Sequence, residues 1–294
     1  MKSAVVLMAY GSPASPEDIT AYYADIRGGR PVSQEAVEEL TERYRRIGGT
    51  SPLNEITERQ RAALEEELGI PVYVGMKHWH PRIREAVDRA AADGVTRITG
   101  IVLAPHFSRM SIGEYHRQLE EACAGRIELV FTAAYGTYEP FVDLVAERIG
   151  STDSHVVFTA HSLPARIREQ NDPYERGLLE SSRLVAERAG VDTWSFAFQS
   201  ASATGEPWLG PDILDELERL RGEGVRKVLV VPIGFVADHL EILWDIDIEA
   251  REKAAELGLE LDRTESLNDD PAFIQVLAGI ARAEPAYPPK VPAA

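Results

Sequence analysis

Short β-branched apolar runs alternate with helical segments along almost the whole chain, and this alternation constrains the fold more than any other feature. The runs lie at Ala4–Met8, Val72–Val74, Ile98–Leu103, Ile127–Phe131, His155–Thr159, Trp194–Phe198 and Lys227–Val231. Between them, apolar residues recur with the spacing of amphipathic helices at Glu35–Ile47, Glu58–Leu68, Arg82–Ala92, Phe141–Ile149, Leu178–Ala189, Ile213–Leu220 and Leu240–Leu257. We therefore predict an α/β fold in which helices cover both faces of parallel sheets.

The two halves of the chain weakly resemble each other. Val5–Pro13 and Val156–Pro164 both run from an apolar segment through an alanine to a ring, which is Tyr10 in one half and His161 in the other. We predict two similar doubly wound domains with parallel four-stranded sheets, at residues 1–150 and 151–284, and a site in the cleft between them. A chance match between common α/β parts is the alternative. The proline-rich residues 285–294 are predicted to form a disordered tail.

Charge and cysteine content exclude several classes of function. The formal net charge is −17, which disfavours nucleic acids and anionic membrane surfaces as partners. It is compatible with a cationic substrate, although such a charge more often serves solubility. A single cysteine, Cys123, cannot form an internal disulfide, a thiolate zinc site or a four-cysteine iron–sulfur cluster. We find no run long enough for a membrane span and no signal peptide, and predict a cytoplasmic protein.

Two strand ends carry ionisable residues. His161 follows the apolar run at 155–159, and Glu241 follows the run at 227–231. Open α/β sheets bind ligands beyond the carboxyl ends of their strands. A histidine and a carboxylate that face each other there could hold a divalent metal ion, transfer protons, or do both. For His161 taken alone, a histidine hydrogen-bonded within the structure is the commoner interpretation.

Glu241 begins a series of acidic residues with helical spacing. Glu241, Asp245 and Glu249 recur every four residues, so a helix would align them on one face. Like charges at this spacing repel each other weakly. Two interpretations of Asp245 and Glu249 stay open, a solvated helix face and a ladder that passes a cation. Glu241 lies among apolar neighbours, which favours a functional role.

Three further groups of residues are weaker candidates. Tyr10 ends a strand, where an aromatic ring can serve packing or function equally well. The segment Lys77–His80 places two histidines where a strand would align them as a metal pair, but the following Pro81 favours a loop. Guanidinium groups suit carboxylates, although surface charge is the better assumption for any one member of the arginine group Arg27, Arg30, Arg43, Arg45 and Arg46. No nucleotide-binding glycine motif is present.

Seven motifs spread from Val5 to Ala281 resemble those of the ferrochelatase family. They are Met8–Pro13, Tyr22–Arg27, Arg43–Leu53, Val102–Ser108, Ala160–Pro164, Pro207–Pro211 and Gly234–Glu241. The likeness is greatest to the monomeric coproporphyrin ferrochelatases of Gram-positive bacteria. It implies a chelatase-like fold of two Rossmann-like domains. It also implies insertion of Fe²⁺ into coproporphyrin III, which gives Fe-coproporphyrin III in haem biosynthesis.

The resemblance also implies roles for residues. His161 and Glu241 would be the catalytic, metal-binding pair, Asp245 and Glu249 would continue outward as a conduit, and Tyr10 would face the metal across the macrocycle. The rest of the porphyrin-binding set would be Arg27, Arg43, Tyr44, Ser51 and Tyr115. Iron would be a substrate, with no tightly bound cofactor and, given one cysteine, no iron–sulfur cluster. The membrane-binding segment of the animal enzymes is missing, so we expect a monomer.

The chemistry of insertion agrees with these residues. Two pyrrole protons must leave, and a neutral imidazole is both a good acceptor near neutral pH and a good Fe²⁺ ligand. A rigid cleft that bows the ring would expose its nitrogen lone pairs. The alternatives are a protoporphyrin ferrochelatase, another tetrapyrrole chelatase such as a cobalt chelatase, a non-catalytic porphyrin or haem carrier, and a two-lobed binding protein.

Overall fold

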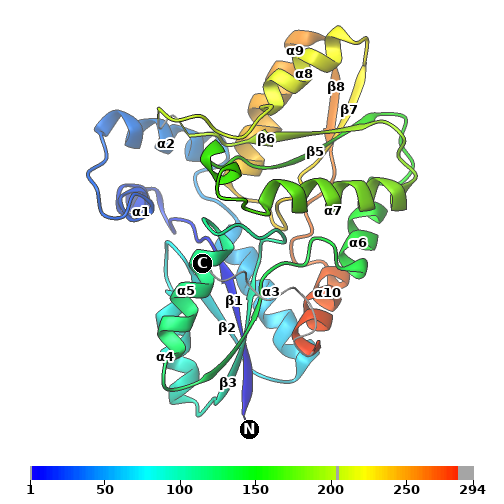
Figure 1. Ribbon diagram of the computed structural model, residues 1–294. Coiled ribbons are helices and arrows are strands. Elements are labelled where there is room, and N and C mark those ends of the chain that lie inside the picture. The colour runs from blue at the N-terminus through cyan, green and yellow to red at the C-terminus, as the bar shows by residue number, and fades with distance from the viewer. Residues whose placement is uncertain (1, 203–204, 284–294) are drawn as a thin grey trace.

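Two parallel four-stranded sheets form the framework of the computed structural model, which describes residues 2–202 and 205–283 (Figure 1). The first sheet has the order β2-β1-β3-β4, and its strands are β1 (Ser3–Ala9), β2 (Val72–Met76), β3 (Arg97–Val102) and β4 (Glu128–Thr132). The second has the order β6-β5-β7-β8, with β5 (His155–His161), β6 (Trp194–Gln199), β7 (Lys227–Val231) and β8 (Glu260–Arg263). The predicted α/β fold is confirmed.

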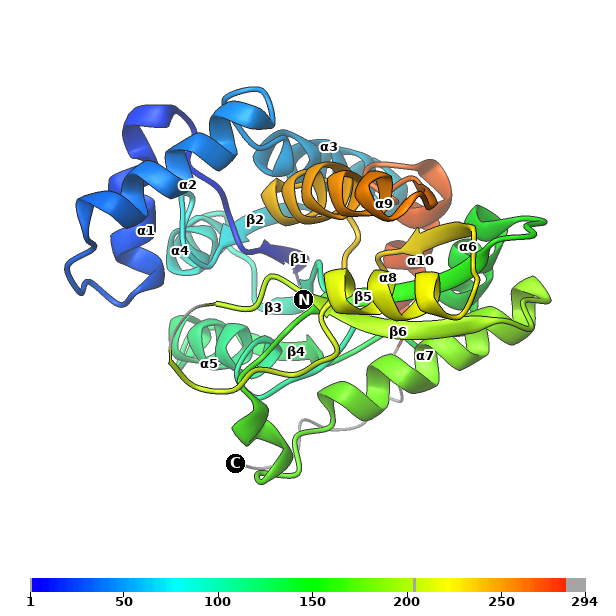
Figure 2. The same ribbon diagram turned by 90° about the horizontal axis from the view of Figure 1, so that it is seen from above.

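Helices cover both faces of these sheets (Figures 1 and 2). In the first half they are α1 (Ile19–Ile26), α2 (Gln34–Arg46), α3 (Leu53–Leu68), α4 (Ile83–Ala92), α5 (Ile112–Cys123) and α6 (Glu139–Ile149). In the second half they are α7 (Tyr174–Ala189), α8 (Ile213–Gly222), the π-helix η3 (Ile242–Ala250), α9 (Arg251–Leu257) and α10 (Pro271–Arg282), and short 3₁₀ turns lie at η1 (Pro16–Asp18) and η2 (Ala165–Arg168). Of the described residues, none belongs to a helix both long and apolar enough to cross a bilayer.

The internal repeat corresponds to equivalent strands. β1 and β5 hold the same place in their sheets, and each pairs in parallel with a neighbour on either side. Tyr10 directly follows β1, and His161 is the last residue of β5. The two rings therefore leave equivalent strand ends, as the repeat predicted. The domain boundary at residue 150 stays a prediction, and the predicted tail at 285–294 lies outside the described residues.

One hydrophobic core joins the two halves. Leu7 and Leu64 of the first half belong to the same buried cluster as Phe158, Phe273 and Leu277 of the second. Helix α10 contributes two of these side chains, and it packs against both α3 and α6. Burial of each large apolar side chain stabilises the fold by about 2 kcal/mol. The shared core therefore fixes the carboxyl ends of both sheets relative to each other.

One sequence prediction requires correction, and one strand was missed. The segment Leu240–Leu257 is not one α-helix, because residues 242–250 form a π-helix and only 251–257 continue as α-helix. π-Helices are rare, so a segment with helical spacing is predicted as α-helix by default. Strand β8 was not predicted. Its four residues, Glu-Leu-Asp-Arg, carry three charges and form a short edge strand.

Candidate active site

His161 is held rigidly at the carboxyl end of β5. Its backbone carbonyl accepts a hydrogen bond from the Tyr174 hydroxyl at 2.9 Å, and its Nδ1 is hydrogen-bonded to the carbonyl of Ser162. Nδ1 therefore carries a proton, and Nε2 is the nitrogen that faces Glu241. Behind this strand end, a Cβ on Gly234 would approach the Ala160 Cβ within 2.5 Å. Only a glycine at position 234 lets the loop after β7 pack this closely against the end of β5.

Glu241 lies between two imidazoles at the start of η3. One carboxylate oxygen is 3.4 Å from His161 Nε2, and the other is 3.4 Å from His239 Nε2. The Glu241 carbonyl accepts a hydrogen bond from the Gln199 amide at 3.0 Å, which fixes the backbone. The structure thus brings together the two residues that the sequence placed on separate strand ends.

The His161–Glu241 pair holds a proton strongly. Burial alone would lower the pKa of His161, but the charge of Glu241 and hydrogen bonds from Glu241 and Ser162 raise it to about 9. Burial would likewise raise the pKa of Glu241, but the charges and hydrogen bonds of His161 and His239 hold it below its usual value. Near neutral pH the pair is an imidazolium and a carboxylate. A metal ion that binds there must displace the His161 proton.

Asp245 is buried in the same site. Only 6% of it is exposed, and its carboxylate accepts hydrogen bonds from Ser200 and, at 3.4 Å, from Gln199. Burial, followed by the charge of Glu241, raises the pKa of Asp245 to about 7. The solvated-face interpretation is therefore wrong for Asp245. Glu249 is half-buried further along the same π-helix.

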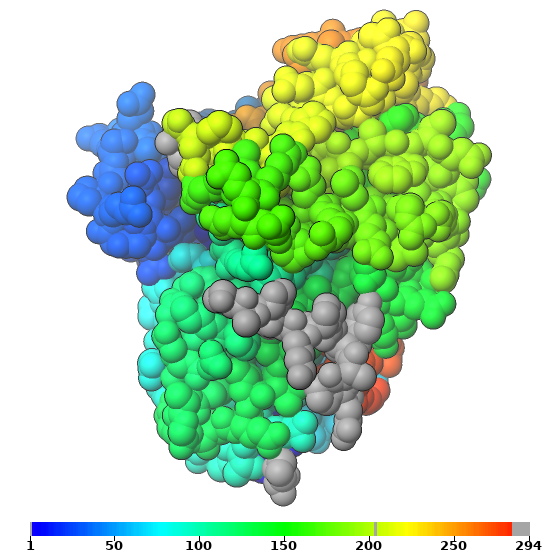
Figure 3. Space-filling view, viewed as in Figure 1, coloured from blue at the N-terminus to red at the C-terminus, as the bar shows by residue number. Residues whose placement is uncertain are grey.

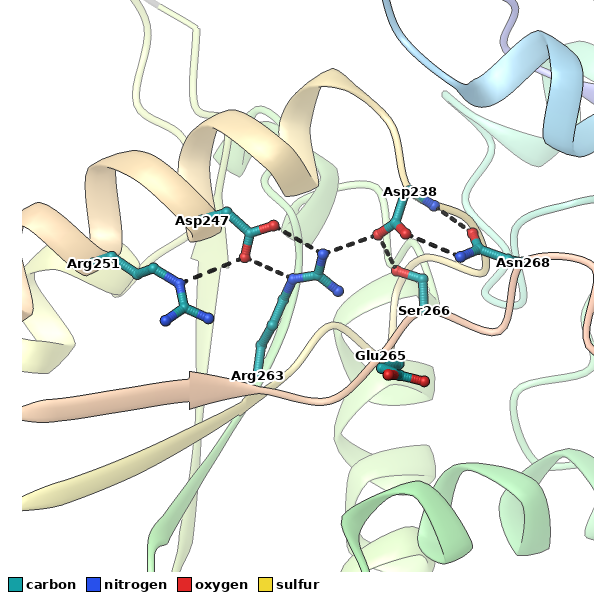
Figure 4. Close-up of a pocket in the computed structure, with 7 residues that line it drawn as sticks. All are labelled: Asp238, Asp247, Arg251, Arg263, Glu265, Ser266 and Asn268. Atoms are coloured by element: carbon teal, nitrogen blue, oxygen red, sulfur yellow. Dashed lines mark hydrogen bonds and ion pairs between the residues drawn. The ribbon is translucent and has the colours of Figure 1, made fainter. Parts of the chain in front are cut away.

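A network of charged residues connects the π-helix η3 to strand β8. Figure 4 shows Arg263 of β8 between two carboxylates, with two hydrogen bonds of 2.8 Å to Asp247 and one of 3.0 Å to Asp238. Asp238 also accepts hydrogen bonds from Ser266 and Asn268 at 2.7 and 2.9 Å. These residues line an open cavity of about 490 Å³. The network connects β8 to the loop before His239 and to the middle of η3.

Tyrosines face Glu241 from the first half. Burial is the main cause that raises the pKa values of Tyr10, Tyr44 and Tyr115, and the charge of Glu241 contributes to each. Tyr10 is 39% exposed, and its ring lies 4.6 Å from that of His78. The Tyr10 ring, which follows β1, therefore lies within electrostatic reach of Glu241. Its predicted place across the macrocycle stays a prediction.

The remaining residues of the predicted porphyrin set are more dispersed. The buried Tyr44 hydroxyl is 3.2 Å from Ser12 Oγ, and the buried Ser51 hydroxyl accepts a hydrogen bond from Leu53 N. Arg43 is partly exposed and pairs with Glu39 at 2.8 Å. Arg27 is exposed at the end of α1.

Two residues near the site were missed in the sequence. His239 contacts Glu241, and its place two residues before a candidate carboxylate was the only available signal. Lys77 lies with its ammonium 5.8 Å from the Tyr10 ring centre and 5.3 Å from that of Tyr115. Burial lowers the pKa of Lys77.

The histidines at positions 78 and 80 do not form a metal pair. His78 Nδ1 is hydrogen-bonded to Asp25 at 2.8 Å, whereas His80 pairs with Glu85. Both lie in a loop, which confirms that interpretation. Within residues 2–202 and 205–283, no three His, Cys, Asp or Glu side chains are arranged to hold a metal ion together.

Comparison with known proteins matches this chain to one family. A family model described as Ferrochelatase covers residues 2–284. The chain belongs to the ferrochelatase family. A ferrochelatase of Herpetosiphon aurantiacus is 44% identical over 94% of this chain and 97% of its own length. One of Deinococcus radiodurans is 42% identical over 94% of each chain. The activity is accordingly that of a ferrochelatase of haem biosynthesis.

Further comparisons concern one coproporphyrin III ferrochelatase and two solved structures. The Coproporphyrin III ferrochelatase of Bacillus subtilis is 40% identical over 95% of this chain and 96% of its own length. The structure of SirB from Bacillus subtilis with Fe³⁺ covers 96% of this ferrochelatase and 95% of its own chain, with a TM-score of 0.60 and 14% identity. CbiX, described as the terminal enzyme for siroheme biosynthesis in denitrifying bacteria, has a TM-score of 0.51 at 14% identity, and covers 97% of this chain and 100% of its own. At such identities these structures show the shared fold alone.

Proposed function

We propose that this ferrochelatase inserts Fe²⁺ into coproporphyrin III, so that the free porphyrin and Fe²⁺ give Fe-coproporphyrin III and two protons. The observation that carries this choice is the position of Tyr10, which leaves β1 within electrostatic reach of Glu241. The 40% identity to the Coproporphyrin III ferrochelatase of Bacillus subtilis supports it. In this proposal His161 and Glu241 are the catalytic, metal-binding pair, and Tyr10 lies on the opposite face of the macrocycle.

Carboxylate groups distinguish the candidate porphyrins. Coproporphyrin III carries twice as many propionates as protoporphyrin IX, and it needs correspondingly more donors. Guanidinium and hydroxyl groups suit carboxylates. We assign the propionates to Arg27, Arg43, Tyr44, Ser51 and Tyr115. The partly desolvated ammonium of Lys77 adds a further positive charge beside Tyr10 and Tyr115.

Proton transfer accounts for the chemistry of the pair. His161 Nε2 must lose its proton to solvent before Fe²⁺ can bind at the pair. Once the ion has passed from the pair to the pyrrole nitrogens, the freed Nε2 accepts one of the displaced pyrrole protons and Glu241 takes the other, and both protons are then released to solvent. With a pKa of about 7, Asp245 can both accept and release protons near neutral pH. The line from Glu241 through Asp245 to Glu249 then serves as the outer conduit for protons and iron.

The remaining features of the proposal concern how the enzyme operates. Iron is the substrate, and the chain works without a tightly bound cofactor. The single cysteine, Cys123, is buried among apolar side chains in α5, where it serves packing. We propose a cytoplasmic monomer.

Anaerobic insertion of Fe²⁺, followed by the loss of porphyrin fluorescence, tests the proposal. Coproporphyrin III and protoporphyrin IX are compared side by side at equal concentrations. We expect a strong preference for coproporphyrin III. Equal or reversed rates would favour the second candidate, a protoporphyrin ferrochelatase. The more similar relatives are named only ferrochelatase, which does not specify the porphyrin.

A variant separates catalysis from binding. His161→Ala should nearly abolish insertion while porphyrin still binds, because the proton acceptor and metal ligand is lost. Full turnover by this variant would contradict the assigned role of His161. If the wild-type protein binds both porphyrins tightly and metallates neither, the carrier alternative replaces the enzyme.

A further inference from the structure

Trp244 of the second half contacts two arginines of the first half. It belongs to η3, one residue before Asp245, and its ring lies 5.5 Å from the guanidinium carbon of Arg43 and 5.1 Å from that of Arg46. Both arginines belong to α2. Arg46 also pairs with Glu252 of α9 at 2.5 Å. Figure 2 shows α2 and α9 along the same side of the molecule.

Helix α2 is weakly fixed apart from these contacts. It packs mainly against α1, and its one fully buried side chain is Tyr44. Figures 1 and 3 show α1 and α2 standing out from the body of the molecule. An arginine on such a helix would sample many rotamers and would lose that freedom on binding a carboxylate. The Trp244 ring limits this freedom before the substrate arrives.

The contact leaves the guanidinium available to a ligand. A cation–π interaction acts through the face of the indole ring, whereas a carboxylate is bound through the N–H groups of the guanidinium. The indole N–H of Trp244 is buried, so it is not exposed to a carboxylate that approaches Arg43 from solvent. The ion pair of Arg43 with Glu39 is on the exposed side of α2 and is easily exchanged.

We propose that Trp244 is a positioning residue for Arg43, and that its indole ring holds the guanidinium ready for a porphyrin carboxylate. This inference rests on the proposed role of Arg43 as a propionate ligand. It also couples the two halves of the site, because the residue that orients a porphyrin ligand lies on the same π-helix as Asp245. Arg46 and Glu252 keep α2 beside that helix.

Porphyrin binding without metal tests the proposal. Coproporphyrin III and its tetramethyl ester, which lacks the carboxylates, are titrated into the wild-type protein and into Trp244→Leu, Trp244→Phe and Arg43→Gln, with binding followed by fluorescence. We expect Trp244→Leu to raise the Kd for coproporphyrin III about fivefold, as for loss of a cation–π contact, and to leave the ester unchanged. Trp244→Phe should retain most of the affinity, because phenylalanine also offers a ring face.

The double variant identifies the route of the effect. In the Arg43→Gln background, Trp244→Leu should cause no further loss of affinity for coproporphyrin III. Arg45→Gln is the matched control, since Arg45 is exposed on the same helix and pairs with Glu42. Equal weakening of acid and ester by Trp244→Leu, or the same loss in the Arg43→Gln background, would overturn the positioning role. If Arg43→Gln itself leaves the Kd unchanged, the propionate assignment in the proposed function fails, and the inference fails with it.

Discussion

Replacing Glu241 with glutamine should change the proton affinity of His161 strongly. The pKa of His161 is raised from 6.5 to about 9, and Glu241 supplies the largest cause that raises it. Without that charge, burial is opposed mainly by the Ser162 carbonyl and the more distant Asp245. We expect the pKa to fall to about 6.5 or below. A fall of about 2.5 units corresponds to about 3 kcal/mol in the relative stability of the imidazolium.

Histidine-labelled protein allows this to be measured by NMR. The ring signals of the seven histidines are followed against pH, and His161→Asn identifies the signal of interest. The wild-type signal should titrate near pH 9 and the Glu241→Gln signal near or below 6.5. Asp153→Asn is the matched control, since this carboxylate pairs with Lys227 on the exposed surface, away from the site. A signal that still titrates near pH 9 in Glu241→Gln would refute the ion pair as the cause.

The same variant should be slow in catalysis. Loss of a positioned proton-transfer group costs about 10²–10⁴ in rate in general, and we expect Glu241→Gln to lower insertion at least about tenfold. In the wild-type protein the pair also contributes to stability. Because the folded pKa of His161 is above its unfolded value, this contribution is complete below pH 6.5 and is lost as the pH rises through 9. The full shift corresponds to at most about 3 kcal/mol, and because both side chains are 32% exposed, solvent screening lowers the contribution below that limit.

Three further predictions concern the framework. Burial lowers the pKa of His106 to about 3. Because the unfolded chain binds a proton at this histidine below pH 6.5 and the folded protein does not, the free energy of unfolding should fall by up to about 3 kcal/mol between pH 6.5 and 4.5. Urea midpoints that fall as steeply with pH in His106→Leu as in the wild-type protein would contradict this. Arg263→Leu removes the nearest positive charge from the partly buried Asp238 and Asp247 and should destabilise by about 3 kcal/mol. Arg251→Leu, with longer and more exposed ion pairs, should cost less than about 1 kcal/mol; equal urea midpoints would count against the network. Gly234→Ala should cost about 1–3 kcal/mol by overpacking against Ala160 and should slow insertion, and unchanged thermal unfolding would show that the loop yields freely.

Much of the fold follows from the sequence because parallel strands buried on both faces are nearly continuous apolar runs. The run Lys227–Val231 corresponds to β7 without change of bounds. The edge strand β8 escapes prediction because its charged side chains need no apolar run. The π-helix escapes because such helices are rare and a helical pattern is assigned to α-helix by default. Strand ends were reliable guides to the site, since topology alone brings such ends to one edge.

The candidate residues could be located from the sequence where they lie directly on a strand end, as His161 and Tyr10 do, and Glu241 by its place after β7. Their roles stay predictions. The contacts of Trp244 were not predictable, because Arg43 and Arg46 lie about 200 residues away on α2. The ion pair between Arg46 and Glu252 spans a similar distance along the chain. Contacts of that kind depend on how the two halves are joined. No periodicity in the chain encodes that arrangement.

The return of α10 to the first half decides which part of the molecule can move. The chain crosses between the halves twice, once from α6 into β5 and again from β8 into α10, and both crossings are packed into the shared core. A relative motion of the two sheets would therefore disturb buried packing. Helices α1 and α2 lie outside this core, and α2 packs mainly against α1. We expect adjustment to a bound porphyrin to fall mainly on α1 and α2, while β5 and β7, which lead to His161 and Glu241, keep their places.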